Sequence, residues 1–143
     1  MEKVIIYTLD TCGYCKTIEQ EFEKNNIEFE NRLTNEWESE WNKVTSLTNL
    51  PATPTIYYKG SYFVPGRDFF NPENLINILS NYEKTEDVSL LHISEKIKTL
   101  NYNMSMAFGR VDQLLKTLNF NIFTAFNRMQ HVLQQITDNT KKE

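Results

Sequence analysis

The chain has 143 residues, of which 40% are hydrophobic and 13% aromatic, enough to form a folded core and too many for a disordered chain. Its net charge of −4 argues against a general nucleic-acid-binding protein, and no run of about 18 apolar residues predicts a membrane-spanning helix. The first apolar stretch, at residues 4–7, is too short for a signal peptide, so we expect a cytoplasmic protein.

The first part of the chain alternates strand-like and helix-like patterns. Ile18 and Phe22 have the spacing of one helix face, and Asn71 before Pro72 is typical of a helix start. In chain order the patterns predict a strand at 4–7, a helix at 13–26, a strand at 27–30, a helix at 35–48, a hairpin at 55–58 and 62–64, and a helix from residue 72. The order βαβαββα predicts an α/β fold with a mixed four-stranded sheet and helices on both sides.

The composition changes near residue 84. All four prolines and three of the four glycines lie before residue 73. Residues 1–84 carry 8 basic and 13 acidic side chains, a net charge of −5, whereas residues 85–143 carry 7 and 6, a net charge of +1. We therefore expect two units, 1–83 and 84–143, joined by a charged hinge at residues 83–87.

The two cysteines, Cys12 and Cys15, form a C-x-x-C motif between the first predicted strand and the first predicted helix. A helix N-terminus offers unpaired N–H groups and a partial positive charge, which stabilise a thiolate at Cys12. Thiolates attack disulfides, and Cys15 is close enough to resolve a mixed disulfide. Two buried structural cysteines, or half of a metal site shared between chains, are the alternatives. His92 and His131 are too distant to complete a zinc site, so no metal is expected.

Three short segments resemble the glutaredoxin family, which has the thioredoxin fold. Cys-Gly-Tyr-Cys at residues 12–15 is similar to the family's usual Cys-Pro-Tyr-Cys. Ala-Thr-Pro-Thr at residues 52–55 stands where thioredoxin-fold proteins carry a cis-proline that faces the cysteines. Pro-Gly-Arg-Asp at residues 65–68 stands where glutaredoxins have Gly-Gly-x-Asp. The resemblance spans residues 3–82 and implies a thioredoxin/glutaredoxin fold there.

This resemblance implies a dithiol oxidoreductase that reduces protein disulfides and glutathione mixed disulfides, with glutathione as co-substrate and no tightly bound cofactor. Asp68 would receive the amino end of glutathione, although a simple turn cap is the alternative. Where many glutaredoxins carry a lysine, Asp10 would repel a glutathione carboxylate, and Arg67 is the candidate that compensates. A thioredoxin-reductase-like flavoenzyme is the alternative reductant. The implied substrate- or glutathione-binding residues are Tyr14, Thr53, Pro54, Gly66, Arg67 and Asp68.

The C-terminal part contains an 18-residue repeat. Residues 101–118 and 119–136 align without gaps. Identical residues at aligned positions include Asn101 and Asn119, and Phe108 and Phe126. Eighteen residues make five helical turns, so the same face returns after each repeat. We expect a long amphipathic helix from about 88 to 137 with an apolar stripe roughly 120° wide. The residues nearest the centre of the stripe are Met104, Phe108, Val111, Leu118, Ile122, Phe126, Met129 and Ile136.

Such a stripe must be covered by something. Self-association into a bundle or coiled coil, docking on a protein partner through residues 88–137, and a hairpin that breaks near Asn119 are all open. Binding to a membrane surface is disfavoured because the polar face is rich in Asn rather than Lys and Arg. The functional alternative to an enzyme is an assembly protein in which the first unit is a scaffold and the helix is the functional part.

Overall fold

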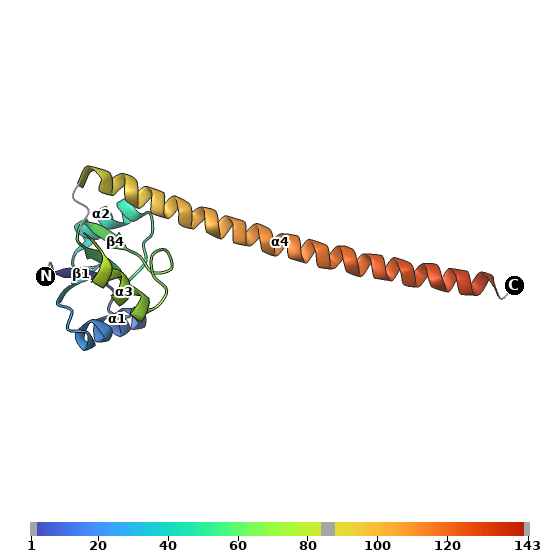
Figure 1. The fold of residues 1–143 in the computed structure, drawn as a ribbon, viewed down its shortest axis with the longest axis horizontal. Helices are drawn as coiled ribbons and strands as arrows, with labels where there is room; N and C mark the ends of the chain where they lie inside the picture. Colours follow the sequence, from blue (N-terminus) through green and yellow to red (C-terminus); the bar gives the residue numbers. More distant parts are fainter. Residues whose placement is uncertain (1–2, 84–87, 142–143) are drawn as a thin grey trace. The chain divides into compact units, whose positions relative to one another are not determined.

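The structure is a computed structural model that describes residues 3–83 and 88–141. Its contacts divide the chain into two compact units, Met1–Tyr102 and Asn103–Glu143. In chain order the elements are β1 (Val4–Thr8), α1 (Gly13–Lys24), β2 (Phe29–Leu33), α2 (Glu38–Thr48), β3 (Thr55–Tyr58), β4 (Ser61–Phe63), α3 (Pro72–Asn81) and α4 (Val88–Thr140) (Figure 1). No helix in the described ranges is long and apolar enough to cross a membrane.

The first unit has the predicted α/β thioredoxin-like arrangement. Its four strands form one mixed sheet in the order β2-β1-β3-β4. β1 and β2 are parallel, which requires the crossover that α1 provides, and both β1–β3 and β3–β4 are antiparallel. The short turn at Lys59 and Gly60, both with positive φ, joins β3 directly to β4.

The two faces of the sheet are covered by different helices. Ile6 of β1 lies in a core cluster with Ile18 of α1 and Leu75 of α3. The next residue, Tyr7, points to the opposite face, where its ring lies 5.8 Å from that of Trp41 of α2. Thus α1 and α3 cover one face and α2 covers the other (Figure 1).

Two predicted elements begin later than the sequence pattern indicated. The strand expected at 27–30 is Phe29–Leu33, because its pairing with β1 runs through five positions. The helix expected at 35–48 begins at Glu38, because the backbone N–H groups of Glu36 and Trp37 both donate to the Leu33 carbonyl and form a turn first.

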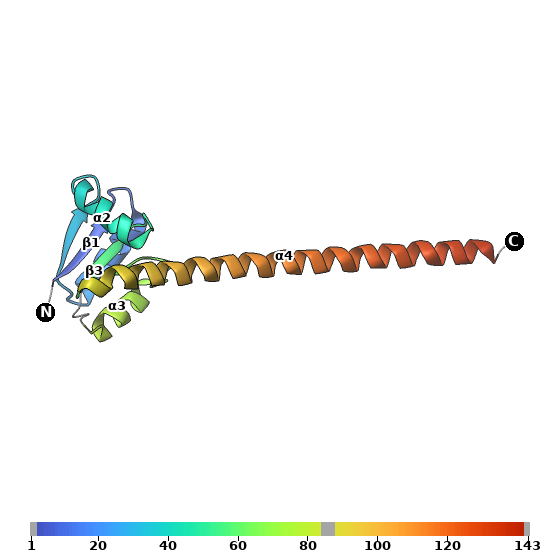
Figure 2. The same ribbon diagram turned by 90° about the horizontal axis from the view of Figure 1, so that it is seen from above.

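The C-terminal helix α4 is continuous from Val88 to Thr140, so the hairpin near Asn119 is not formed. Its first turns, up to Tyr102, belong to the first unit, whereas the sequence placed the boundary at residue 83. Within this unit the first turns of α4 pack beside α2 and β4 (Figure 1), and Figure 2 shows α2 beside these turns from a second direction. Of the predicted hinge at 83–87, residues 84–87 lie outside the described residues.

The start of α4 caps the end of α2. The Lys96 ammonium donates to the Ser46 carbonyl at 2.7 Å, and the Thr99 hydroxyl donates to the Thr48 carbonyl at 2.5 Å. The last carbonyls of a helix have no partner within the helix, so these contacts satisfy groups that would otherwise need water.

Candidate active site

Cys12 caps the N-terminus of α1 directly after the loop that follows β1. Its Sγ accepts a hydrogen bond from the Cys15 backbone N–H at 3.1 Å. Its own N–H donates to the Leu9 carbonyl at 3.0 Å, which fixes the turn before the helix. Because the first N–H groups of a helix carry partial positive charge, this position favours a thiolate once the sulfur is reduced.

Cys12 and Cys15 are joined in a disulfide, with 2.08 Å between the sulfurs. Cys12 is partly exposed, whereas Cys15 is buried, with 1% of its surface accessible. An incoming thiol or disulfide therefore reaches Cys12 first, and Cys15 can act on it only from inside the protein.

The segment before β3 lies against this pair. The Thr53–Pro54 peptide bond is cis, and the Thr53 carbonyl oxygen is 4.0 Å from Cys12 Sγ. Pro54 is buried, and the Thr55 hydroxyl holds the turn by donating to the Ala52 carbonyl at 2.6 Å. The backbone of Thr53 thus borders the reactive sulfur, where an extended ligand chain could pair with it.

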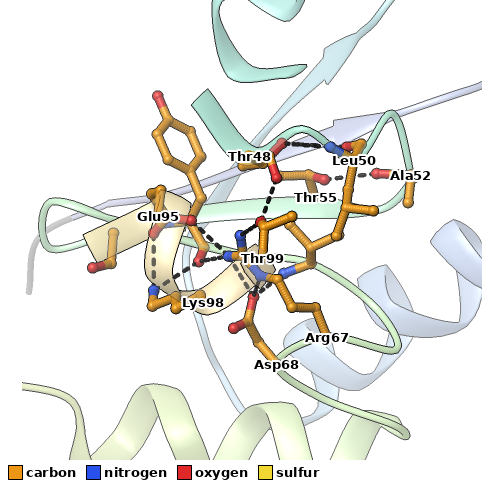
Figure 3. Close-up of polar contacts among 12 residues, drawn as sticks. Thr48, Leu50, Ala52, Thr55, Arg67, Asp68, Glu95, Lys98 and Thr99 are labelled. Atoms are coloured by element: carbon orange, nitrogen blue, oxygen red, sulfur yellow. Dashed lines mark hydrogen bonds and ion pairs between the residues drawn. The ribbon is translucent and has the colours of Figure 1, made fainter. Parts of the chain in front are cut away.

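A tight loop at residues 65–68 follows β4. Gly66 has φ +78°, a conformation that favours glycine, and its N–H donates to the Phe69 carbonyl at 2.8 Å. Asp68 Oδ2 accepts from the Val64 N–H at 2.7 Å and from Arg67 Nε at 2.8 Å (Figure 3). Within residues 3–83 and 88–141 its other oxygen, Oδ1, has no protein donor, so it can accept from a ligand.

Residues 4–63 match the family model described as Glutaredoxin. This segment is a glutaredoxin domain. The match covers fewer than half of the 143 residues, and it includes the cysteine pair and the Thr53–Pro54 turn but neither the 65–68 loop nor α4. A glutaredoxin from Archaeoglobus fulgidus is structurally similar, with 22% identity over 57% of this chain and 89% of that chain, at a TM-score of 0.47. No curated protein matches the chain.

The glutaredoxin domain brings some of the predicted site residues together. Cys12 and Thr53 are adjacent through the 4.0 Å approach of sulfur and carbonyl. Tyr14 instead packs against the core cluster, and its hydroxyl is buried without a hydrogen-bond partner among the described residues. Burial raises the pKa of Tyr14 above its ordinary value, so the phenol stays neutral.

The side chain of Arg67 is only 1% exposed, so it does not lie on the surface where a glutathione carboxylate would meet it. Its guanidinium is bound from within the first unit: Nη1 donates to the Thr99 hydroxyl at 3.1 Å, and Nη2 donates to the Tyr62 carbonyl at 3.0 Å and to Glu95 Oε2 at 2.6 Å (Figure 3). The expected compensation for Asp10 by Arg67 therefore has no support in this geometry.

Sequence reasoning missed Glu95 and Thr99. They are four residues apart on α4, and both are buried, with 0% and 2% of their surface accessible. Polar residues on an amphipathic helix are ordinarily assigned to the solvent face, so no pattern in the chain marks these two as buried. Among the described residues no three His, Cys, Asp or Glu side chains come together in a way that could hold a metal ion.

Proposed function

We propose that this protein is a glutathione-dependent dithiol oxidoreductase that reduces protein disulfides and glutathione mixed disulfides in a reducing, cytoplasmic compartment. The glutaredoxin domain and its Cys12–Cys15 pair support thiol–disulfide exchange as the class of reaction. The observation that carries the proposal is the partly exposed Cys12 sulfur at a helix N-terminus, beside the Thr53 carbonyl.

In the proposed cycle the reduced enzyme begins with a Cys12 thiolate. It attacks one sulfur of the substrate disulfide, the substrate S–S bond breaks, and the second sulfur leaves as a thiolate that takes up a proton. Cys15 then loses its proton and attacks the Cys12 sulfur of the mixed disulfide, which releases the other half of the substrate and forms the Cys12–Cys15 disulfide. Two glutathione molecules return this disulfide to the dithiol, and they leave as one molecule of glutathione disulfide.

Glutathione would bind along the segment that borders Cys12. Its peptide backbone would pair with the N–H and carbonyl of Thr53, next to the buried Pro54. The free Oδ1 of Asp68, beyond Gly66 in the tight loop, would accept from the α-ammonium group. A flavoenzyme reductant is the competing hypothesis, because it needs only the disulfide and no glutathione site.

Turnover of a glutathione mixed disulfide tests the proposal, with glutathione plus glutathione reductase in one arm and thioredoxin reductase in the other. We expect the wild type to turn over only in the glutathione arm. Cys12→Ser should abolish turnover, because it removes the nucleophile, whereas Cys15→Ser should retain monothiol exchange. Turnover only in the flavoenzyme arm would replace glutathione as reductant, and full activity of Cys12→Ser would overturn the mechanism.

For the C-terminal tail, residues 103–143, we propose that copies of the chain associate through this second unit. From residue 103 to residue 140 nearly every side chain is exposed, including large apolar ones such as Phe108 at 68% and Leu114 at 69%. Burying each large apolar side chain contributes about 1.5–3 kcal/mol, so a few per chain can hold copies together after the loss of association entropy. The segment carries three cationic and two anionic side chains, so its net charge is close to zero. Such a charge does not oppose pairing of the segment with itself, and it does not favour binding to an anionic lipid surface.

The mass of the full-length particle in solution tests this second proposal. Light scattering at high concentration, with helical content measured on the same sample, should give a multiple of the chain mass together with a fully helical tail. A helical monomer would leave docking on another protein as the role of the tail. Loss of helix in the tail would refute the amphipathic-stripe argument itself.

A further inference from the structure

Arg67 and Glu95 form a buried ion pair that the proposed reaction does not use. Their side chains are 1% and 0% exposed, and Nη2 of the arginine lies 2.6 Å from Oε2 of the glutamate. The glutamate is also held at its other oxygen, which accepts from the Tyr62 N–H at 3.3 Å and from Lys98 Nζ at 2.8 Å. Every polar atom of this pair thus has a partner, which a buried pair requires.

The same arginine also contacts the carboxylate of the 65–68 loop. Nη2 of Arg67 lies 2.7 Å from Asp68 Oδ2, about as near as it lies to Glu95. One guanidinium is therefore shared between two carboxylates (Figure 3). With Asp68 alone as its partner, the arginine would neutralise that carboxylate and leave little attraction for a cationic ligand.

We propose that Glu95 is a positioning residue for the 65–68 loop: it balances the charge of Arg67, so that Asp68 keeps its negative charge toward the α-ammonium of glutathione. The proposal rests on the proposed glutathione site and extends it to α4, outside the segment that matches the family model. Lys98 acts in the opposite sense, because its ammonium also pairs with Glu95 and so competes with Arg67 for the glutamate charge. The Lys98 side chain is 28% exposed, so it makes this contact from the solvent side.

Two substitutions on α4 are therefore expected to change glutathione recognition in opposite directions. Glu95→Gln keeps the shape of the side chain but leaves Arg67 to pair with Asp68 alone, so the KM for a glutathione mixed disulfide should rise about fivefold with little change in kcat. Lys98→Met leaves the Glu95 charge to Arg67, so the same KM should fall, by up to about twofold. Lys96→Met is the matched control, since among the described residues the Lys96 ammonium donates to Ser46 and Asn49 at the end of α2 and not to Glu95, and it should change neither constant.

The decisive comparison uses the same mixed disulfide made from glutathione that lacks its α-amino group. Wild type should bind this analogue more weakly than the parent, and neither Glu95→Gln nor Lys98→Met should alter its KM, because the interaction they modulate is missing. A KM that changes equally for both substrates, or in the same direction in both variants, would overturn the proposal. If Glu95→Gln does not fold, the partly exposed Lys98→Met decides alone: a fall confined to the parent substrate supports the proposal, and a rise or no change refutes it. Absence of wild-type turnover on both substrates would instead refute the proposed glutathione dependence.

Discussion

The two parts of α4 expose apolar side chains alike, for example Ile93 and Phe108, but they differ in the polar side chains that they bury. In the first unit the helix buries the polar residues Glu95 and Thr99, whereas from residue 103 to residue 140 nearly every side chain is exposed. Glu95 and Thr99 are buried because ionic and hydrogen-bonding partners surround them. The apolar residues are exposed because nothing in a single chain covers them. Burial along this helix thus follows the presence of a partner rather than the polarity of the side chain.

Of the changes that test this contrast, shortening the chain should have the largest effect on the stability of the first unit. A chain that ends at Tyr102 keeps every contact of the first unit, whereas one that ends at Tyr82 lacks Glu95 and leaves Arg67 with Asp68 as its one carboxylate partner among the described residues. Breaking a buried ion pair by removing one partner costs about 3–5 kcal/mol. Denaturant unfolding should therefore show that the shorter chain is less stable by about that amount.

Arg67→Met in the shorter chain provides the control for this measurement. It removes the cation that has lost its Glu95 partner, so it should restore part of the lost stability. Equal stability of the two truncated chains would show that the first turns of α4 contribute nothing to the first unit, contrary to the structure.

Charges placed on the apolar stripe should change the second unit alone. Val111 and Met129 are equivalent in the two repeats, and 51% and 59% of their surfaces are accessible in the single chain. Val111→Asp with Met129→Asp would put unpaired charges into the buried face of an assembly, so the particle mass should fall to that of one chain. Disulfide reductase activity should stay unchanged.

Gln113→Asp with His131→Asp is the matched control, because these residues are also equivalent in the two repeats and lie on the opposite side of the helix. This pair should leave the particle mass as it was. The same loss of assembly in both double variants would show that helix stability, and not the stripe, was affected.

Substitutions at two matched threonines of α4 should give the smallest change in the free energy of unfolding. Thr99 and Thr117 lie 18 residues, or five helical turns, apart on the same helix. Thr99 is buried and contacts Arg67 and Thr48, whereas Thr117 is exposed and donates to the Gln113 carbonyl. Thr99→Val should lower the free energy of unfolding by about 1–3 kcal/mol, because it leaves buried groups without partners. Thr117→Val should change it by less than about 0.5 kcal/mol, and similar values for the two variants would contradict the contrast within α4.

Much of the first unit could be predicted because its signals are local. The Cys12–Cys15 spacing, the cap at Asn71 and the periodicity of Ile18 and Phe22 each depend on a few neighbouring residues, and the structure shows a helix at each of these places. The approach of Thr53 to Cys12 is a tertiary contact, so it was predicted from the resemblance to a family of known fold and not from a local pattern.

The environment of Arg67 could not be predicted in the same way. Its partners Glu95 and Thr99 follow it by 28 and 32 residues, beyond a change in composition that indicated a separate unit. A glutamate on an amphipathic helix is ordinarily solvated, so its burial depends on a tertiary contact that no local pattern encodes. The 65–68 loop could therefore be predicted as a candidate site, but the helix that packs against Arg67 could not.

The most direct test of the central claim is to find which sulfur forms the bond with glutathione. Cys15→Ser, treated with glutathione disulfide and digested without reductant, should carry one glutathione on Cys12, as read by peptide mass spectrometry. Cys12→Ser treated in the same way should carry almost none, because the Cys15 sulfur is buried. Equal labelling of Cys15 in that variant, or no adduct on Cys12, would contradict the assignment of Cys12 as the nucleophile.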